Sequence, residues 1–154
     1  MDVITARKNP QKFIDYLSAD ERVNWHFVND PIWSTMPTPS PKTWGWCGTV
    51  QMNFNASLTV SFPSLEWQYV RRWTFHQSDA THTATWYGGI IIDTMFNALI
   101  YNRKYYKLTS CPIVELNKNI FNKYYRNPCQ IYDFSRLEII SGSKQRGSFP
   151  SLLP

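Results

Sequence analysis

The chain has 154 residues, a formal net charge of +5 and an aromatic content of 16%. This length predicts one domain with a substantial core, and the aromatic content excludes an intrinsically disordered chain. A mean hydropathy of −0.40, without an apolar run of membrane-spanning length, excludes a transmembrane helix. The first residues lack an apolar segment, so we expect no secretory signal.

Residues 1–43 are predicted to form a short helix followed by a proline-rich arm. Phe13, Ile14 and Leu17 have helical spacing within residues 9–23, and a proline suits the first turn. Four prolines between residues 29 and 43 disfavour both helix and sheet.

Residues 49–62 alternate without interruption between polar and apolar side chains. This period of two predicts a long strand, or a hairpin that turns near Asn53–Asn55, with one buried face. The alternation assigns one parity to a polar face: Gln51, Asn53, Asn55, Ser57 and Thr59. The other parity is assigned to the core or to contacts between subunits: Val50, Met52, Phe54, Leu58, Val60 and Phe62.

The next segment, residues 64–77, is predicted to be a helix. Ser64 suits the N-cap position, and an apolar stripe that includes Trp67 and Trp73 follows it. We therefore expect both tryptophans to pack in the core or between subunits.

The remainder of the chain is predicted to be strands. Residues 89–102 indicate one buried strand or two strands that meet near Asn97, while residues 105–116 and 130–141 indicate further strands. The predicted fold is mainly β, an antiparallel sandwich or barrel with a long hairpin and one packed helix at about residues 64–77. We expect a tube-like domain over residues 44–141 and a flexible basic tail over residues 142–154.

The residue types that carry chemistry do not form an evident motif. Three cysteines without CxxC spacing favour reduced thiols, and three histidines complete no zinc pattern. These residues are Cys47, Cys111, Cys129, His26, His76 and His82. A capping or surface role suits His76, and packing or an interface suits His26.

Two alternatives to a purely structural role stay open. Asp93 and Glu115 with Lys104 or Lys107 have the residue types of a metal-dependent nuclease. Tyrosines interleaved with basic residues at 101–107 and 121–127 suit stacking on single-stranded nucleic acid, although tyrosines on strand surfaces and at subunit contacts are the favoured explanation.

The order of these predicted elements resembles the tail-tube proteins of contractile-tailed bacteriophages, which share a fold with type VI secretion inner-tube proteins. Residues 58–62 are similar to the family's strand before its helix, and residues 64–77 to that helix. Residues 104–116 and 127–140 are similar to two later strands, so the resemblance covers about residues 48–141.

The resemblance implies a virion protein of the tail, assembled in the host cytoplasm as stacked, hexameric rings. The polar parity of residues 49–62 would then face the lumen, through which genomic DNA passes without specific binding. Its partners would be its own copies and sheath or baseplate proteins, with no cofactor, no metal and no enzymatic activity. The alternatives are another neck, baseplate or capsid-associated subunit, or a single-stranded nucleic-acid-binding β module.

Overall fold

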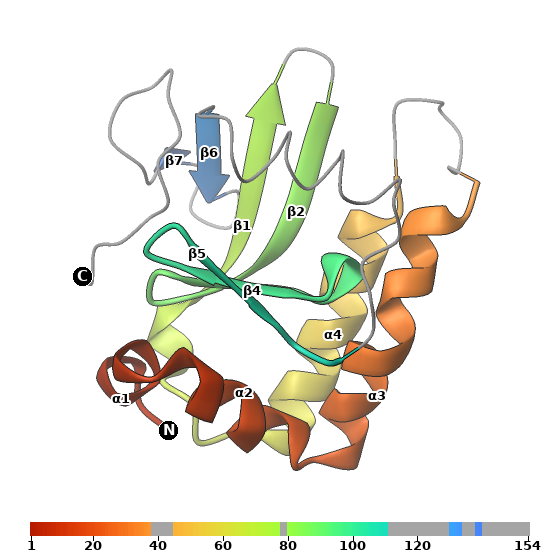
Figure 1. Ribbon diagram of the computed structural model, residues 1–154. Coiled ribbons are helices and arrows are strands. Elements are labelled where there is room, and N and C mark those ends of the chain that lie inside the picture. The colour runs from red at the N-terminus through yellow and green to blue at the C-terminus, as the bar shows by residue number, and fades with distance from the viewer. Residues whose placement is uncertain (38–44, 78–79, 111–129, 134–137, 140–154) are drawn as a thin grey trace.

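A computed structural model describes residues 1–37, 45–77, 80–110, 130–133 and 138–139. Within these residues the helices precede the sheet in the chain (Figure 1). The helical elements up to residue 61 are α1 (Val3–Lys8), α2 (Pro10–Ser18), α3 (Glu21–Asn29), the 3-10 helix η1 (Asp30–Thr35), and α4 (Cys47–Ser61).

Side-chain caps explain why the N-terminal helices are short. Asp2, Asn9 and Asp20 accept hydrogen bonds from the amides of Thr5, Lys12 and Val23, at 2.7, 3.1 and 3.0 Å. Each cap starts a new helix by satisfying one of the unpaired amides of its first turn. The single helix predicted over residues 9–23 is therefore two helices, which are separated at Asp20.

The strand or hairpin predicted over residues 49–62 is wrong, because these residues belong to α4. Val50, Phe54 and Leu58 lie four residues apart, so the alternating pattern also contains the spacing of one helical face. These three side chains are buried, whereas Met52 and Val60, which belong to the same apolar parity, are 57% and 60% exposed. The alternation thus concealed a helix with apolar side chains on both its inner and outer faces.

The helix predicted over residues 64–77 is also wrong. A short 3-10 helix η2 (Trp67–Tyr69) leads into strand β1 (Val70–Gln77). This strand is rich in β-branched and aromatic residues, which favour the pleated conformation. It pairs in antiparallel register with β2 (Ala80–Tyr87), from Val70 opposite Tyr87 to Gln77 opposite Ala80.

The strands form one antiparallel sheet in the order β5-β4-β3-β2-β1-β6-β7. The remaining elements are β3 (Ile90–Asp93), η3 (Thr94–Phe96), β4 (Ala98–Tyr101), β5 (Lys104–Lys107), β6 (Gln130–Asp133) and β7 (Glu138–Ile139). Two strands meet near Asn97, as one of the two interpretations of residues 89–102 predicted. The predicted antiparallel sheet is confirmed, but helix exceeds strand in the described residues, so the prediction of a mainly β fold with one packed helix is not confirmed. The sheet does not close into a barrel in the described residues, and four α-helices accompany it.

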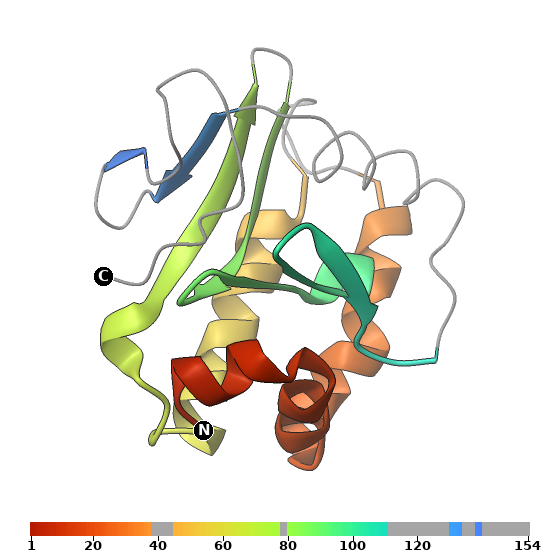
Figure 2. The same ribbon diagram turned by 60° about the vertical axis from the view of Figure 1, so that its left-hand side comes forward.

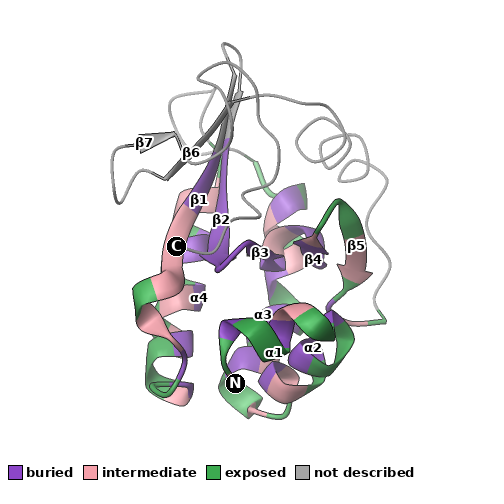
Figure 3. Cartoon of the chain, turned by 90° about the vertical axis from the view of Figure 1, so that its left-hand side faces the viewer, coloured by how far each residue is buried: buried purple, intermediate pink, exposed green. Residues whose placement is uncertain are grey.

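The helices cover the sheet in two groups (Figures 1 and 2). Helices α3 and α4 lie side by side on one flank, where α4 packs against β2, while α1 and α2 lie beneath the part of the sheet that contains β4. Figure 3 shows buried residues, in purple, along β2 and β3 and in stretches of the helices.

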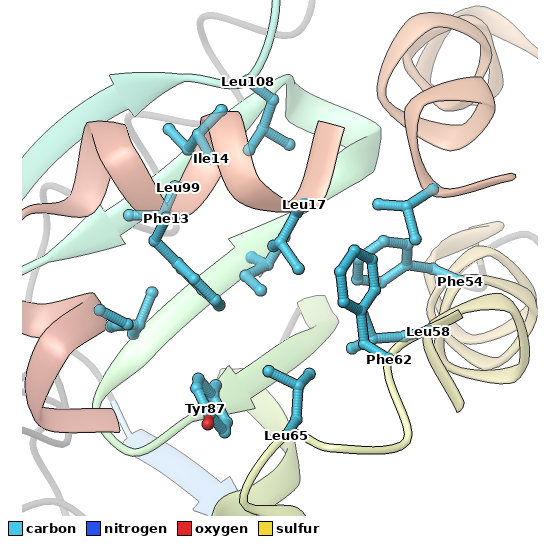
Figure 4. Close-up of a cluster of buried hydrophobic side chains, with 14 of the residues drawn as sticks. Phe13, Ile14, Leu17, Phe54, Leu58, Phe62, Leu65, Tyr87, Leu99 and Leu108 are labelled. Atoms are coloured by element: carbon cyan, nitrogen blue, oxygen red, sulfur yellow. The ribbon is translucent and has the colours of Figure 1, made fainter. Parts of the chain in front are cut away.

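One hydrophobic cluster joins these layers (Figure 4). Phe13 stacks on Tyr87 with ring centroids 5.6 Å apart, and Phe54 contacts Phe27 at 6.0 Å. The cluster also includes Val3, Leu17, Leu58, Phe62, Leu65, Ile90, Ile92 and Leu99. Residues on both sides of the domain boundary predicted at 43–44 therefore pack together, while the predicted tail, residues 142–154, lies outside the described residues.

We expect Gly88→Ala to destabilise the fold by about 1–3 kcal/mol. Gly88 has a φ of 54°, and a Cβ atom at this position would overlap the side chain of Val3. Urea unfolding measures the change. Gly48→Ala is the matched control, because a Cβ atom there meets nothing within 4 Å and its helical position favours alanine. Equal destabilisation by the two substitutions would contradict the close approach of α1 to the β2–β3 turn.

Candidate active site

Cys47 is the first residue of α4, where the helix meets the sheet. The preceding residue, Trp46, donates its indole N–H to the Pro37 carbonyl at 2.7 Å and packs against Trp33 with ring centroids 5.0 Å apart. Further along α4, Asn55 accepts a 2.7 Å hydrogen bond from the Thr85 hydroxyl of β2. These contacts fix the helix along its axis and against β2, and thereby fix the position of Cys47.

His82 lies on β2 and is only 2% exposed. Its ring packs against Phe96 and Trp73, with centroids 4.8 and 6.5 Å away. Its Nε2 lies 2.6 Å from Oδ2 of Asp93, so this nitrogen donates to the carboxylate. The Cys47 thiol lies close enough to this ring that a hydrogen bond and charge between the two groups shift both of their pKa values.

Asp93 ends β3 and caps η3. Its Oδ1 accepts a 3.2 Å hydrogen bond from the Phe96 amide, while Oδ2 contacts His82. Pairing of Thr85 with Ile92 places Asp93 opposite Ala84 on the neighbouring strand. His82 lies two residues from Ala84 and so shares its face of the sheet, which is why the carboxylate and imidazole meet.

Charge and hydrogen bonding favour an ion pair between the thiol and the imidazole. Burial by itself lowers the pKa of His82, but the charge of Asp93 and the hydrogen bonds with Asp93 and Cys47 outweigh it and raise the pKa to about 10. Burial by itself raises the pKa of Cys47, but the hydrogen bond and positive charge of His82, with the Thr83 amide, lower the pKa below its usual value. The arrangement therefore stabilises a thiolate beside an imidazolium.

A small cavity of about 10 Å³ lies beside these residues, which is room for one water molecule. Its polar lining includes Cys47, Gln51 and Asp93, and its apolar lining includes Val50 and Met95. The thiol thus borders a narrow space that is lined by both polar and apolar side chains.

The structure distributes the predicted lumen-facing residues over several environments. Gln51 is buried beside the cavity, while Asn53 and Thr59 are exposed. Asn55 bonds to Thr85, and the hydroxyl of Ser57 lies 2.8 Å from Nε2 of His26. They therefore do not share one face, because the segment is a helix.

The residues predicted for the core or for subunit contacts also divide. Buried positions are Val50, Phe54, Leu58, Phe62 and Trp73. Trp67 is half-buried and donates its indole N–H to the Phe62 carbonyl at 3.1 Å, whereas Met52 and Val60 are exposed.

Each of the two alternative sites weighed from the sequence depends in part on residues outside the described part of the chain. Asp93 pairs with His82, Lys104 and Lys107 are exposed on β5, and Glu115 lies outside the described residues. In the part of the chain that the structure describes, no group of three or more His, Cys, Asp or Glu side chains is arranged to hold a metal ion. Of the two tyrosine-rich clusters, residues 101–107 form the β4–β5 hairpin, and residues 121–127 lie outside the description.

Sequence reasoning did not bring Cys47, His82 and Asp93 together. A signal was present, because a cysteine at the start of a helix followed by histidine and aspartate on neighbouring strands is a pattern of thiol catalysis. That pattern becomes visible only when residues 47–61 are assigned to a helix.

No helix among the described residues combines the length and apolar character needed to cross a bilayer. No family model, no curated protein and no solved structure matches the chain.

Proposed function

We propose that the protein is a thiol-dependent acyl hydrolase in which Cys47 is the nucleophile. The observation that carries this proposal is the contact of one imidazole with two partners. The Nε2 of His82 lies 2.6 Å from the Asp93 carboxylate, and the interaction of the same ring with the Cys47 thiol shifts the pKa values of both groups. A nucleophile, a base and a group that orients the base form the recurring unit of covalent acyl transfer.

The first chemical step would be attack of the Cys47 thiolate on the carbonyl carbon of an ester or amide. The resulting tetrahedral intermediate collapses to a thioester on Cys47, and the His82 imidazolium gives its proton to the leaving group. Asp93 holds the ring through Nε2, and its negative charge supports the imidazolium.

The second step would be hydrolysis of that thioester. Neutral His82 takes a proton from a water molecule as its oxygen attacks the thioester carbonyl, and departure of the sulfur releases the acid and regenerates the thiolate–imidazolium pair. The cavity beside Cys47 has space for one water molecule and thus suits this role.

The start of α4 would also stabilise the negative charge that develops on the carbonyl oxygen. The first amides of a helix have no partner within the helix, and the N-cap residue Trp46 supplies no side-chain hydrogen bond to them. These amides and the positive end of the helix dipole attract an oxyanion formed beside Cys47.

A thioester on Cys47 is the expected intermediate and can be trapped. We expect p-nitrophenyl acetate to release a burst of p-nitrophenol and to leave an acetyl group on Cys47, located by peptide mass spectrometry. The control variant Cys47→Ala should show no burst, whereas Cys111→Ser with Cys129→Ser should retain it. Acetylation distributed equally over the three cysteines would contradict the proposal.

The tail-tube role implied by the resemblance remains a second proposal, in place of the first or alongside it. The observation that favours assembly is the exposure of Met52 and Val60 on α4 and of Trp25, Val28 and Ile32 on α3 and η1. Exposed apolar side chains of this number suit contacts between subunits. Negative-stain microscopy of the purified protein tests it: rings or tubes would support assembly, and a monodisperse monomer at high concentration would count against it.

A further inference from the structure

A second buried polar cluster lies next to the candidate active site. His26 Nδ1 is 3.0 and 3.2 Å from the two carboxylate oxygens of Asp30, and its Nε2 is 2.8 Å from the Ser57 hydroxyl. The Thr94 hydroxyl donates to Oδ2 of Asp30 at 2.6 Å. His26, Asp30 and Thr94 are 6%, 2% and 3% exposed, so the cluster is almost completely removed from water.

The cluster joins four elements that are separate in the chain. His26 belongs to α3, Asp30 starts η1, Ser57 belongs to α4 and Thr94 starts η3. The element η3 packs against η1, α3 and α4, which agrees with these hydrogen bonds. Buried polar groups are costly unless they are paired, so this arrangement strongly favours one relative position of the four elements.

Thr94 directly follows Asp93, so the cluster reaches the candidate active site through the backbone. At the start of η3, Thr94 is bonded to Asp30 while Asp93 caps the Phe96 amide. At its end, Asn97 has a φ of 55° and its side chain bonds to Thr109, accepting from the Thr109 amide at 2.9 Å. The turn that carries Asp93 is thus held at both ends.

We propose that Asp30 and Thr94 are positioning residues, which hold the η3 turn so that Asp93 stays against His82. The inference rests on the proposed function, and it assigns the cluster a role in that reaction beyond stabilising the fold. A displacement of about 1 Å at a reacting group is enough to lower a rate by about 10²-fold. The 2.6 Å contact between Asp93 and His82 therefore needs a rigid support.

Thr94→Val is the sharpest test, because it removes one hydroxyl and keeps the shape of the side chain. Asp30 retains His26 as a partner, so no buried carboxylate is left without one. We expect the turnover number for p-nitrophenyl acetate to fall by about 10- to 100-fold with little change in KM. Thr94→Ser keeps the hydroxyl and is expected to restore most of the rate.

The second readout is the pH dependence of Cys47 alkylation by iodoacetamide. The titratable groups that interact with the His82–Asp93 pair are Cys47 from α4 and Tyr105 from β5, and the one facing Asp30 is His26 from α3. Thr94→Val changes none of these groups. If the alkylation profile of Thr94→Val rises at higher pH than that of the wild type, the contact between Asp93 and His82 is weakened. An unchanged unfolding midpoint would show that the fold is retained.

The outcomes separate this inference from the proposed function. If wild-type Cys47 is alkylated with the profile of an ordinary thiol, the proposed function fails. The proposed function requires instead that the wild-type alkylation profile of Cys47 lies at low pH. If it does, and Thr94→Val shows the same profile and the same turnover as the wild type, only the positioning role fails. Covalent labelling of Ser57 by a fluorophosphonate would also overturn it, because the cluster would then be a second nucleophilic site.

Discussion

Replacing His82 with alanine is expected to remove the enhanced reactivity of Cys47. At about pH 6, alkylation by iodoacetamide should fall by about 10²-fold, because the thiol returns toward the usual cysteine pKa of about 8.5. The hydrogen bond and positive charge of His82 are the two largest influences that lower the pKa of Cys47. Turnover of p-nitrophenyl acetate should fall further, since both proton transfers require the imidazole.

A matched control is available in the same chain. Like His82, His26 is buried and pairs with an aspartate, in this case Asp30. Its ring contacts Ser57 and not Cys47. His26→Ala removes a buried imidazole of the same size but keeps the bond from Thr94 to Asp30, so we expect it to change alkylation of Cys47 at about pH 6 much less than His82→Ala does. Equal loss of reactivity in the two variants, with both still folded, would show that His82 has no special relation to the thiol.

Replacing Asp93 with asparagine is the second change with a large expected effect. Asparagine keeps the shape of the side chain but removes the charge that most strongly raises the pKa of His82. In the serine-protease triad the corresponding substitution lowers the turnover number about 10⁴-fold, and we expect a loss of about 10²- to 10⁴-fold here. The turnover number for p-nitrophenyl acetate measures it.

The pH profile gives this second prediction a sign. In the wild type the pKa of His82 is raised to about 10, so the imidazolium persists at neutral pH and is lost as the pH rises through about 10. Its contribution to stability is accordingly present at low pH and is lost over that alkaline range. In Asp93→Asn the alkaline limb of turnover should move to lower pH. An alkaline limb at the same position would contradict the role assigned to Asp93.

The sequence predicted the later strands better than the first half of the fold. The alternation at 49–62 matched a strand, but Val50, Phe54 and Leu58 satisfy a helical face as well. The strand and helix patterns differ in whether Met52 and Val60 are buried, and no local property of the sequence contains that information. By contrast, the meeting of two strands at Asn97 follows from a residue that tolerates a positive φ.

The candidate site was out of reach for the same reason. Cys47 gains its significance from its place at the start of α4, and the strand assignment for 49–62 hid that place. His82 and Asp93 are 11 residues apart and meet only through the register of β2 with β3. Asp93 was identified as a candidate functional residue, but with a metal-site role that its contact with His82 does not suggest.

The central claim is that Cys47 exists as a thiolate paired with the His82 imidazolium. The most direct measurement is the rate of Cys47 alkylation by iodoacetamide across the pH range, followed by peptide mass spectrometry in the wild-type protein. We expect the alkylation rate to be already high at about pH 6 and to fall only at still lower pH. A rate that is negligible at about pH 6 and rises with a midpoint near the ordinary cysteine pKa of about 8.5 would contradict it.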